Sequence, residues 1–475
     1  MILKRTIIFL AIAALLPLFA CKMSVAGDEP VYRQALDDGL VIIVKEAPDA
    51  KIEALRLYVK TGSSMEGHFV GSGISHFTEH MIFKGTKSRP VGRIQEDIKA
   101  IGGYMNAATS YDYTDFEVDV PGERFYEGAD ILLDAVVNPV FDKRELKKER
   151  DVILREIKMN DDDPDKLFSN LVWSSVYTVH PYKYPVIGFQ DLFEKLTADD
   201  LKKYHDKKYT PNNMVFVAVG PVKQPEVFTL VKTYFKNIKM GWQDTSVLPQ
   251  EPEQAAVKEI KEQARVSLTR LALCFKTIPV NSEDLFALDA LSIILGHGNS
   301  SRLYKKLKEE ADTVYSVDSF NYTPKYQGFF GIMCVLEREK EAQAKKAILG
   351  AIKQMKTAAP GAAELAKAKK QVLSDYLFNL ESVDGQAEDI ATDEVICSDA
   401  NFSKKYIAGI NSVSGKDIMR VANKYLNDNN LTIVSLEPVG AGQRVRPLAG
   451  QSKPTRANTW VCPYTAGRGN QEIYA

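Results

Sequence analysis

Residues 71–86 read GSGISHFTEHMIFKGT, and they decide how the rest of the chain is interpreted. His76 and His80 are four residues apart, so on a helix their imidazoles leave the same face one turn apart and can bind one tetrahedral zinc ion. Glu79 lies beside them on that face. The order His-x-x-Glu-His reverses the commoner His-Glu-x-x-His zinc motif. The stretch therefore predicts a helix that carries two metal ligands and a carboxylate next to the metal.

A third ligand is needed, and the segment KKERDVILREIKM, residues 147–159, offers one. Glu149 and Glu156 are seven residues apart, so on a helix they lie about two turns apart on one face, with Leu154 and Ile157 turned elsewhere. Taken alone, each glutamate also fits an ordinary solvated helix face. The pattern by itself leaves that alternative open.

Three stretches resemble the pitrilysin family of inverted-zincin metallopeptidases, which includes insulin-degrading enzyme and the mitochondrial processing peptidase. They are GISHFTEHMIFKGT at 73–86, GGYMNAATSYDYTDFEVDVP at 102–121 and ERDVILREIKMNDDDPD at 149–165. The family's distal glutamate ligand follows the second histidine at the spacing found here, 156 − 80 = 76 residues. The resemblance extends over both halves of the chain, from about residue 30 to about residue 440.

The resemblance implies a role for each residue of this site. His76, His80 and Glu156 ligate one Zn2+ per chain, Glu79 is the general base, and Glu149 steadies a histidine ligand by accepting its free N–H. Three protein ligands leave a fourth position for water, whose pKa zinc lowers to about 7. The implied function is that of a zinc-dependent endopeptidase acting on short or unfolded peptides. The alternative is a non-catalytic scaffold or partner subunit of the same fold.

Two further segments are implied to contact the peptide substrate. Asn106 and Ala107 lie in MNAATSYDYT, which in the family pairs with an extended substrate as an added β-strand. An ordinary edge strand is the alternative. In NSSRLYKKLKEEADTVYSV, residues 299–317, Lys308 and Tyr315 hold the places of a family arginine and tyrosine that contact the substrate, and Tyr315 is also expected to take part in catalysis.

Lysine at position 308 departs from the family pattern, as do Asp312 and Thr313, where the family has glycine and leucine. Lysine cannot reproduce the two-pronged hydrogen bonding of arginine, so the second half is expected to bind substrate poorly. We therefore expect a homodimer, or a heterodimer with a related subunit that lacks the zinc motif and supplies the arginine. A solvated lysine and a buried core tyrosine are the alternatives for Lys308 and Tyr315.

A repeated plan predicts two halves. Residues 196–201 and 413–418 each open a helix that leads through paired asparagines into an apolar strand, at an offset of 413 − 196 = 217 residues. In each copy a hydroxyl residue is followed three residues later by an acid, as in a capping box. We expect an α+β fold of two homologous halves, each a mixed sheet packed with helices, arranged like a clamshell.

The expected boundaries follow from composition and periodicity. They are 30–244 for a zinc-binding domain, 245–256 for a polar, proline-containing linker, 257–439 for a homologous domain without the zinc motif, and 440–475 for a disordered tail. Within the first half, strands are expected at 53–60 and 114–120, and helices at 144–160 and 201–208.

The N-terminus has the pattern of an export signal. A basic start precedes the apolar run TIIFLAIAALLPLFA, and the small residues that follow allow cleavage after Ala26, which gives a signal peptide at 1–26. LFAC at 18–21 resembles a bacterial lipoprotein box, so a signal that ends at residue 20 and a lipid anchor on Cys21 is an alternative. An uncleaved anchor helix is another. The expected location is the periplasm, or the outer membrane, of a Gram-negative bacterium.

Composition excludes other classes of protein. Lys+Arg of 61 against Asp+Glu of 62 gives no basic excess for nucleic-acid binding. The five cysteines form no CxxC pair, so neither a disulfide framework nor a cysteine zinc site is indicated. Cys274 and Cys334 sit in hydrophobic runs and are expected to be buried thiols. His297, in ILGHGNSS, is interpreted as a loop residue and not as a metal ligand.

Overall fold

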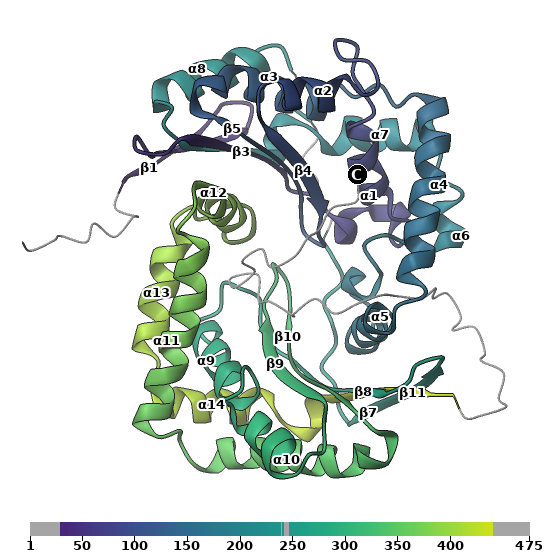
Figure 1. Ribbon diagram of the computed structural model, residues 1–475, viewed down its shortest axis with the longest axis vertical. Coiled ribbons are helices and arrows are strands. Elements are labelled where there is room, and N and C mark those ends of the chain that lie inside the picture. The colour runs from purple at the N-terminus through teal and green to yellow at the C-terminus, as the bar shows by residue number, and fades with distance from the viewer. Residues whose placement is uncertain (1–28, 239, 242–246, 440–475) are drawn as a thin grey trace, which may run out of the picture.

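The computed structural model describes residues 29–238, 240–241 and 247–439. The predicted signal peptide with Cys21, residues 245–246 of the predicted linker and the predicted tail at 440–475 lie outside the described residues. Two mixed sheets with their helices form two halves, one above the other in Figure 1. The expected α+β architecture of two homologous halves is confirmed.

The first half is built on a six-stranded sheet with the order β1-β2-β6-β3-β5-β4. Its strands are β1 (Val31–Ala35), β2 (Val41–Glu46), β3 (Ile52–Val59), β4 (Tyr104–Thr109), β5 (Thr114–Pro121) and β6 (Met214–Gly220). The apolar runs VIIVKE and MVFVAVG form β2 and β6, which pair in parallel inside the sheet and are almost wholly buried. The more polar YMNAAT forms β4, which lies at one edge of the sheet.

The second half repeats this plan with a five-stranded sheet in the order β7-β11-β8-β10-β9. Its strands are β7 (Lys258–Ala264), β8 (Thr269–Lys276), β9 (Ser316–Tyr322), β10 (Phe329–Leu336) and β11 (Leu431–Pro438). Only β7 and β11 pair in parallel, as β2 and β6 do in the first sheet. The edge strand β9 therefore corresponds to β4.

Helices complete both halves. Those of the first half are α1 (Ile74–Ile82), α2 (Arg93–Ala100), α3 (Phe125–Val137), α4 (Lys143–Asn160), α5 (Pro164–Val176), α6 (Gln190–Phe193), α7 (Ala198–Lys208) and α8 (Gln224–Phe235). Those of the second half are α9 (Leu285–Leu295), α10 (Glu341–Thr357), α11 (Ala362–Asn379), α12 (Val383–Thr392), α13 (Phe402–Ser412) and α14 (Gly415–Tyr425). Both predicted capping boxes are confirmed, at the N-termini of α7 and α14.

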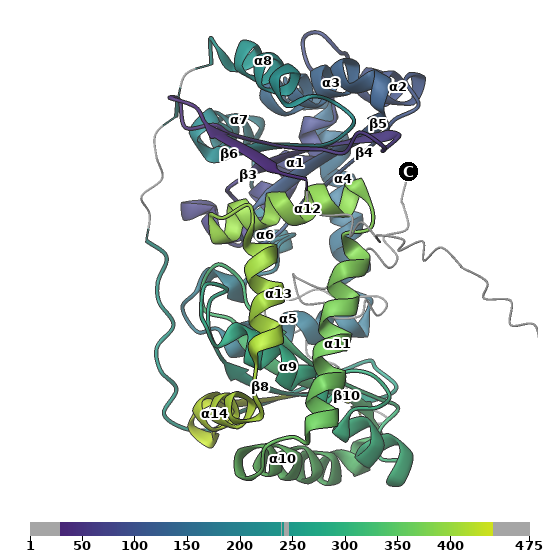
Figure 2. The same ribbon diagram turned by 90° about the vertical axis from the view of Figure 1, so that its left-hand side faces the viewer.

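The two halves exchange one helix each. Helix α12 of the second half packs through Ala387 and Ile390 on the face of the first sheet that carries Ile43 and Tyr58. Helix α5 of the first half packs against the second sheet, next to β8 and β11. Figure 2 shows α12 directly beneath the first sheet, at the top of the long helices α11 and α13. A single boundary in the sequence would therefore assign each of these helices to a different domain from the sheet it covers. The expected domain boundaries stay a prediction.

Buried charges reinforce this exchange. Arg56 on β3, 1% exposed, forms ion pairs with Glu117 and Asp119 on β5 and with Asp384 on α12. Because a guanidinium removed from water is costly unless it is paired, the ion pair with Asp384 helps to hold α12 on the sheet. Glu251 of the predicted linker is also buried, and it accepts hydrogen bonds from the backbone N–H groups of residues 178–180.

The expected burial of Cys274 and Cys334 is confirmed, and both are free thiols. His297 lies in the loop after α9, as expected, with Nδ1 3.1 Å from Asp318. Within the part of the chain that the structure covers, no helix combines the length and apolar character needed to cross a membrane.

Candidate metal centre

Helix α1 carries the two histidines. Its buried face, which includes Ile74, Phe77 and Met81, packs into the core of the first half and turns the other face toward α4. At its N-terminus Gly73 adopts φ 72°, and a side chain there would collide with the carbonyl oxygen of Ile187 at 2.1 Å. This close approach requires glycine, and it fixes where the helix begins.

Helix α4 carries the two glutamates. Asp142 caps its N-terminus by accepting hydrogen bonds from the backbone N–H groups of residues 144 and 145. Leu146, Ile153 and Ile157 bury one stripe of the helix in the core of the first half. The helix runs alongside α1 in Figure 1. The side chains on its α1 side therefore meet those of the histidine helix.

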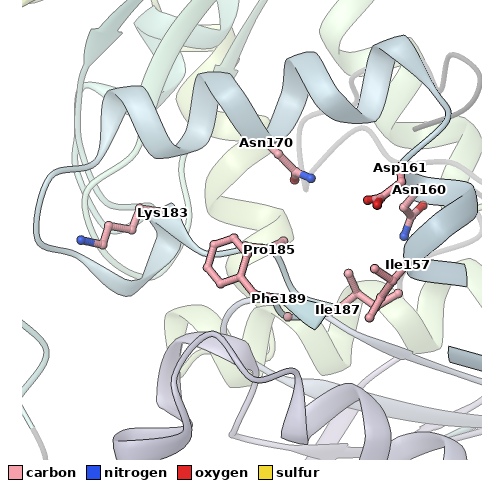
Figure 3. A pocket seen from close by; sticks show the side chains of 9 residues that line it. Ile157, Asn160, Asp161, Asn170, Lys183, Pro185, Ile187 and Phe189 are labelled. Atoms are coloured by element: carbon pink, nitrogen blue, oxygen red, sulfur yellow. The ribbon is translucent and has the colours of Figure 1, made fainter. Parts of the chain in front are cut away.

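The segment 183–189 contacts the N-terminal end of α1 and the C-terminal end of α4. Phe189 donates a backbone hydrogen bond to the carbonyl oxygen of Gly71, just before α1, and Ile187 packs against the core of the first half. Figure 3 shows Ile187 and Phe189 around a small pocket with Ile157 and Asn160 from the end of α4. The same segment thus touches both elements that carry the candidate ligands.

His76, His80 and Glu156 come together at one point. One potential ligand atom from each of them lies within 4.8 Å of the other two. Nε2 of His76 is 3.9 Å from Oε1 of Glu156, and Nε2 of His80 is 3.9 Å from Oε2. Atoms that share one zinc ion at about 2.0–2.2 Å lie within about 4.4 Å of each other. The two imidazoles and the carboxylate are therefore close enough for one zinc ion, and the Glu156 side chain, 41% exposed, leaves the group open to solvent.

Glu149 orients His80. Its Oε1 lies 2.8 Å from Nδ1 of His80, and its Oε2 lies 2.7 Å from Nζ of Lys84. With the Nδ1 proton directed at the carboxylate, the lone pair of Nε2 points at Glu156 and the candidate metal position. Burial opposes ionisation of Glu149, but the hydrogen bonds from His80 and Lys84 outweigh it and lower its pKa.

Burial and neighbouring charges shift the pKa values of the other groups. It lowers the pKa of His76 well below its usual value, so this imidazole is neutral, the form that binds metals. It also raises the pKa of Glu156 and of Glu79. Burial alone would lower the pKa of His80, but the hydrogen bond with Glu149 and the carboxylates of Glu79 and Glu156 give a net increase.

Glu79 lies next to the metal position on α1 and is 7% exposed. Its Oε2 accepts a 2.8 Å hydrogen bond from the hydroxyl of Thr109, the last residue of β4. Sequence reasoning missed Thr109. The available signal was alternation along β4, because Thr109 shares a face with Ala107 and follows it by two residues.

The predicted substrate-contacting residues on β4 are at the sheet edge. Asn106 is opposite Glu117 and Ala107 is opposite Phe116 on β5, the neighbour of β4. Among the described residues no strand pairs with the other side of β4. An added strand could therefore pair with the outer edge of β4, which ends beside Glu79.

Lys308 and Tyr315 lie next to each other but do not contact the candidate metal ligands. Lys308 lies in the π-helix η6 (Tyr304–Glu310), with Nζ 5.7 Å from the ring centre of Tyr315. The Tyr315 hydroxyl donates a 2.5 Å hydrogen bond to Glu337 in the same half. Tyr315 is 54% exposed, so it is not a core tyrosine. No hydrogen bond or ion pair joins either residue to His76, His80 or Glu156 in the part of the chain that the structure describes.

The second half has no metal group of this kind among the described residues. Helix α9 packs beside β9 as α1 packs beside β4. It has no histidine pair, and its one acidic residue is Asp289. Asp289 is buried and accepts hydrogen bonds from Asn321 on β9 and Tyr406 on α13. Both carboxylate oxygens of Asp289 therefore accept hydrogen bonds inside the protein.

Comparison with known proteins gives the family. A model of "Insulinase (Peptidase family M16)" matches residues 41–189, and a model of "Peptidase M16 inactive domain" matches residues 195–372. An uncharacterized zinc protease of Rickettsia felis is 30% identical over 392 residues, which covers 82% of this chain and 93% of that protein. The chain belongs to peptidase family M16. The expected pitrilysin-type resemblance is confirmed.

Other M16 proteins agree over most of the chain. A probable mitochondrial-processing peptidase β subunit of Arabidopsis thaliana is 26% identical, covering 91% of this chain and 83% of its own. The crystal structure of a protease from Helicobacter pylori superposes with a TM-score of 0.79 at 27% identity, covering 86% of this chain and 100% of that chain. The metal group lies inside the insulinase match, and the half that lacks one falls largely within the inactive-domain match.

Proposed function

We propose that this M16 protein is a zinc-dependent endopeptidase that hydrolyses peptides or unfolded polypeptides in the bacterial envelope. The convergence of His76, His80 and Glu156 from two helices carries the proposal. Zinc bound by these groups would supply Lewis acidity to a water molecule and to the scissile carbonyl at the position left open by three protein ligands.

The chain's own residues provide the remaining chemistry. Glu79 is the general base, because it lies beside the metal position. Burial raises its pKa toward that of the zinc-bound water from which it would take a proton. Thr109 holds the Glu79 carboxylate in place. Glu149 keeps the Nε2 lone pair of His80 directed at the metal position. A scaffold protein would need none of these three contacts.

The substrate is proposed to add as a strand to the outer edge of β4, next to Asn106 and Ala107. Pairing through the backbone makes few demands on sequence and suits unfolded chains. Lys308 and Tyr315 remain proposed substrate contacts of the second half, and the proposed assembly is a homodimer or a heterodimer with a related subunit that supplies the missing arginine. A protein that stays monomeric in light scattering while fully active would contradict that part.

The envelope location rests on the export pattern of residues 1–26. We infer export with cleavage after Ala26, or a lipid anchor at Cys21 as the alternative. Mass spectrometry of the N-terminus of the natively produced protein distinguishes these outcomes. An intact N-terminus would contradict both.

Removing the metal tests the proposed activity. We expect about one zinc per chain by elemental analysis and hydrolysis of an unstructured peptide by the purified protein, because three protein ligands hold one ion. A chelator should abolish hydrolysis, and an equal amount of added zinc should restore it. A chelated, zinc-free protein that still hydrolyses the peptide at full rate would contradict the proposal.

A further inference from the structure

Arg150 links the three helices α1, α4 and α6, which lie on the right in Figure 1. It follows Glu149 on α4. Its guanidinium carbon lies 5.5 Å from the ring centre of Phe77 on α1 and 5.7 Å from that of Phe193 on α6. Both phenylalanines are fully buried, and their ring centres are 4.9 Å apart. Since Phe77 follows His76 in the chain, Arg150 touches α1 next to a candidate metal ligand.

The same guanidinium donates hydrogen bonds to three backbone carbonyl groups. Nη1 donates to the carbonyl oxygens of Phe193 and Glu194, at 3.1 and 2.9 Å. Nη2 donates to the carbonyl oxygen of Leu196. The guanidinium is a flat, rigid fork of N–H donors, so three fixed acceptors determine both its position and its orientation. Arg150 therefore ties α4 to the chain that runs from α6 to α7.

That chain is in turn attached to the start of α1. The segment 183–189 holds the N-terminal end of α1 through the hydrogen bond from the backbone N–H of Phe189 to the carbonyl oxygen of Gly71. Residues 190–196 continue from this contact to the carbonyl groups that Arg150 binds. Helix α4 is thus linked to α1 by two routes, one through the aromatic ring on α1 and one through the backbone.

The metal centre requires one axial position of α4 against α1. Leu146, Ile153 and Ile157 hold α4 in the core by apolar contacts, but the hydrophobic effect has no direction. A slide by one residue along a helix moves a side chain by about 1.5 Å, whereas a metal site needs its ligands placed within about 0.5 Å. Hydrogen bonds are directional, so those of Arg150 can prevent a slide that apolar packing would tolerate.

We propose that Arg150 is a positioning residue of the metal centre, which fixes the axial position of α4 so that Glu149 meets His80 and Glu156 reaches the zinc position. The inference rests on the proposed function for the presence of zinc. Arg150 acts through the two carboxylates, because no hydrogen bond or ion pair joins it to His76, His80 or Glu156 in the described ranges. Loss of the guanidinium should therefore weaken zinc binding although all three ligands remain.

Zinc affinity and the absorption of a cobalt-substituted protein test this without requiring hydrolysis. Arg150→Met removes the charge and the donors, whereas Arg150→Lys keeps the charge over the rings but not the planar fork. Zinc affinity is measured in competition with a chromophoric chelator, and the visible spectrum of bound Co2+ reports the coordination geometry. We expect Arg150→Met to lower zinc affinity by about 10–100-fold and to alter the cobalt spectrum, and Arg150→Lys to restore part of both.

Arg89→Met is the matched control for a general loss of stability. Arg89 lies in the same half and forms ion pairs with Asp97 on α2 and with Asp130 and Asp134 on α3. Urea unfolding of the zinc-free proteins measures the stability that each variant loses. Because none of these partners lies on α1 or α4, Arg89→Met should lower stability but change zinc affinity by less than about twofold.

Two results would overturn the inference. One is wild-type zinc affinity together with an unchanged cobalt spectrum in the Arg150 variants. The other is an equal fall of zinc affinity in Arg89→Met, which would assign the effect to stability. Should Arg150→Met not fold, Arg150→Lys alone decides, because it keeps the charge and most of the volume of the side chain.

Hydrolysis of an unstructured peptide at saturating zinc separates this inference from the proposed function. For Arg150→Lys we expect kcat to fall while KM is kept, because Arg150 contacts α1, α6 and residues 194–196 and the substrate is proposed to pair with β4. Arg150-dependent zinc affinity in a chain that does not hydrolyse peptides would contradict the endopeptidase proposal and support the inference. Hydrolysis by the wild type with unchanged zinc affinity in both Arg150 variants would do the reverse. A wild-type chain that binds neither metal would overturn both.

Discussion

Replacing Glu79 by glutamine should lower the rate of peptide hydrolysis by about 10²–10⁴-fold, while the protein still binds one zinc per chain. Glutamine keeps the shape of the side chain and can keep the hydrogen bond with Thr109. It cannot accept a proton from water. Since Glu79 is not among the three converging ligand groups, metal binding should be unaffected.

The Glu79 experiment needs three readouts, which are kcat on a fluorogenic peptide, zinc content, and the KM or Kd of the peptide. A matched variant is Glu96→Gln, which makes the same change at an exposed position on α2 and should behave as wild type. Equal turnover by wild type and Glu79→Gln would refute the assigned base. Loss of zinc in Glu79→Gln would show instead that this residue holds the metal.

Replacing Glu156 by alanine should remove both the zinc and the activity. The variant leaves two imidazoles from α1 as protein ligands and takes away the carboxylate that has an oxygen 3.9 Å from each of them. Two neutral ligands give a weaker site without the charge that offsets Zn2+. We expect zinc affinity to fall by more than 100-fold in competition with a chromophoric chelator, and hydrolysis to disappear at limiting zinc.

Glu149→Gln is the graded comparison on the same helix. It removes the charge that orients His80 but leaves all three ligand groups, so zinc affinity should fall by about 10–100-fold and activity should return at high zinc. Both variants should remain folded, because the Glu156 side chain is 41% exposed and glutamine fits the place of Glu149. Unchanged zinc affinity in Glu156→Ala would contradict the ligand assignment.

Local sequence patterns predicted the elements that carry the site. The histidine spacing predicted α1, and the expected helix at 144–160 agrees with α4 at Lys143–Asn160. Both capping boxes were predicted, because the signal lies within four residues of sequence. The strands expected at 53–60 and 114–120 agree within one residue with β3 and β5. Each of these features depends on periodicity or on contacts between near neighbours in sequence.

Features that depend on distant residues were not predicted. The exchange of α5 and α12 between the sheets rests on contacts such as that of Arg56 with Asp384, 328 residues away in the chain. The local sequence around Arg56 and Asp384 does not distinguish either residue from an ordinary charged residue at the surface. The contact of Thr109 with Glu79 also required knowledge of how β4 lies against α1. The convergence of Glu156 with the histidines was expected only through the family resemblance, since helix periodicity alone fits a solvated face equally well.

Diffraction from crystals of the zinc-loaded protein, measured on both sides of the zinc absorption edge, tests the central claim most directly. One anomalous peak per chain is predicted, about 2.0–2.2 Å from Nε2 of His76, Nε2 of His80 and a carboxylate oxygen of Glu156. A peak at any other position, or zinc bound to the two histidines with Glu156 beyond coordination distance, would contradict the account.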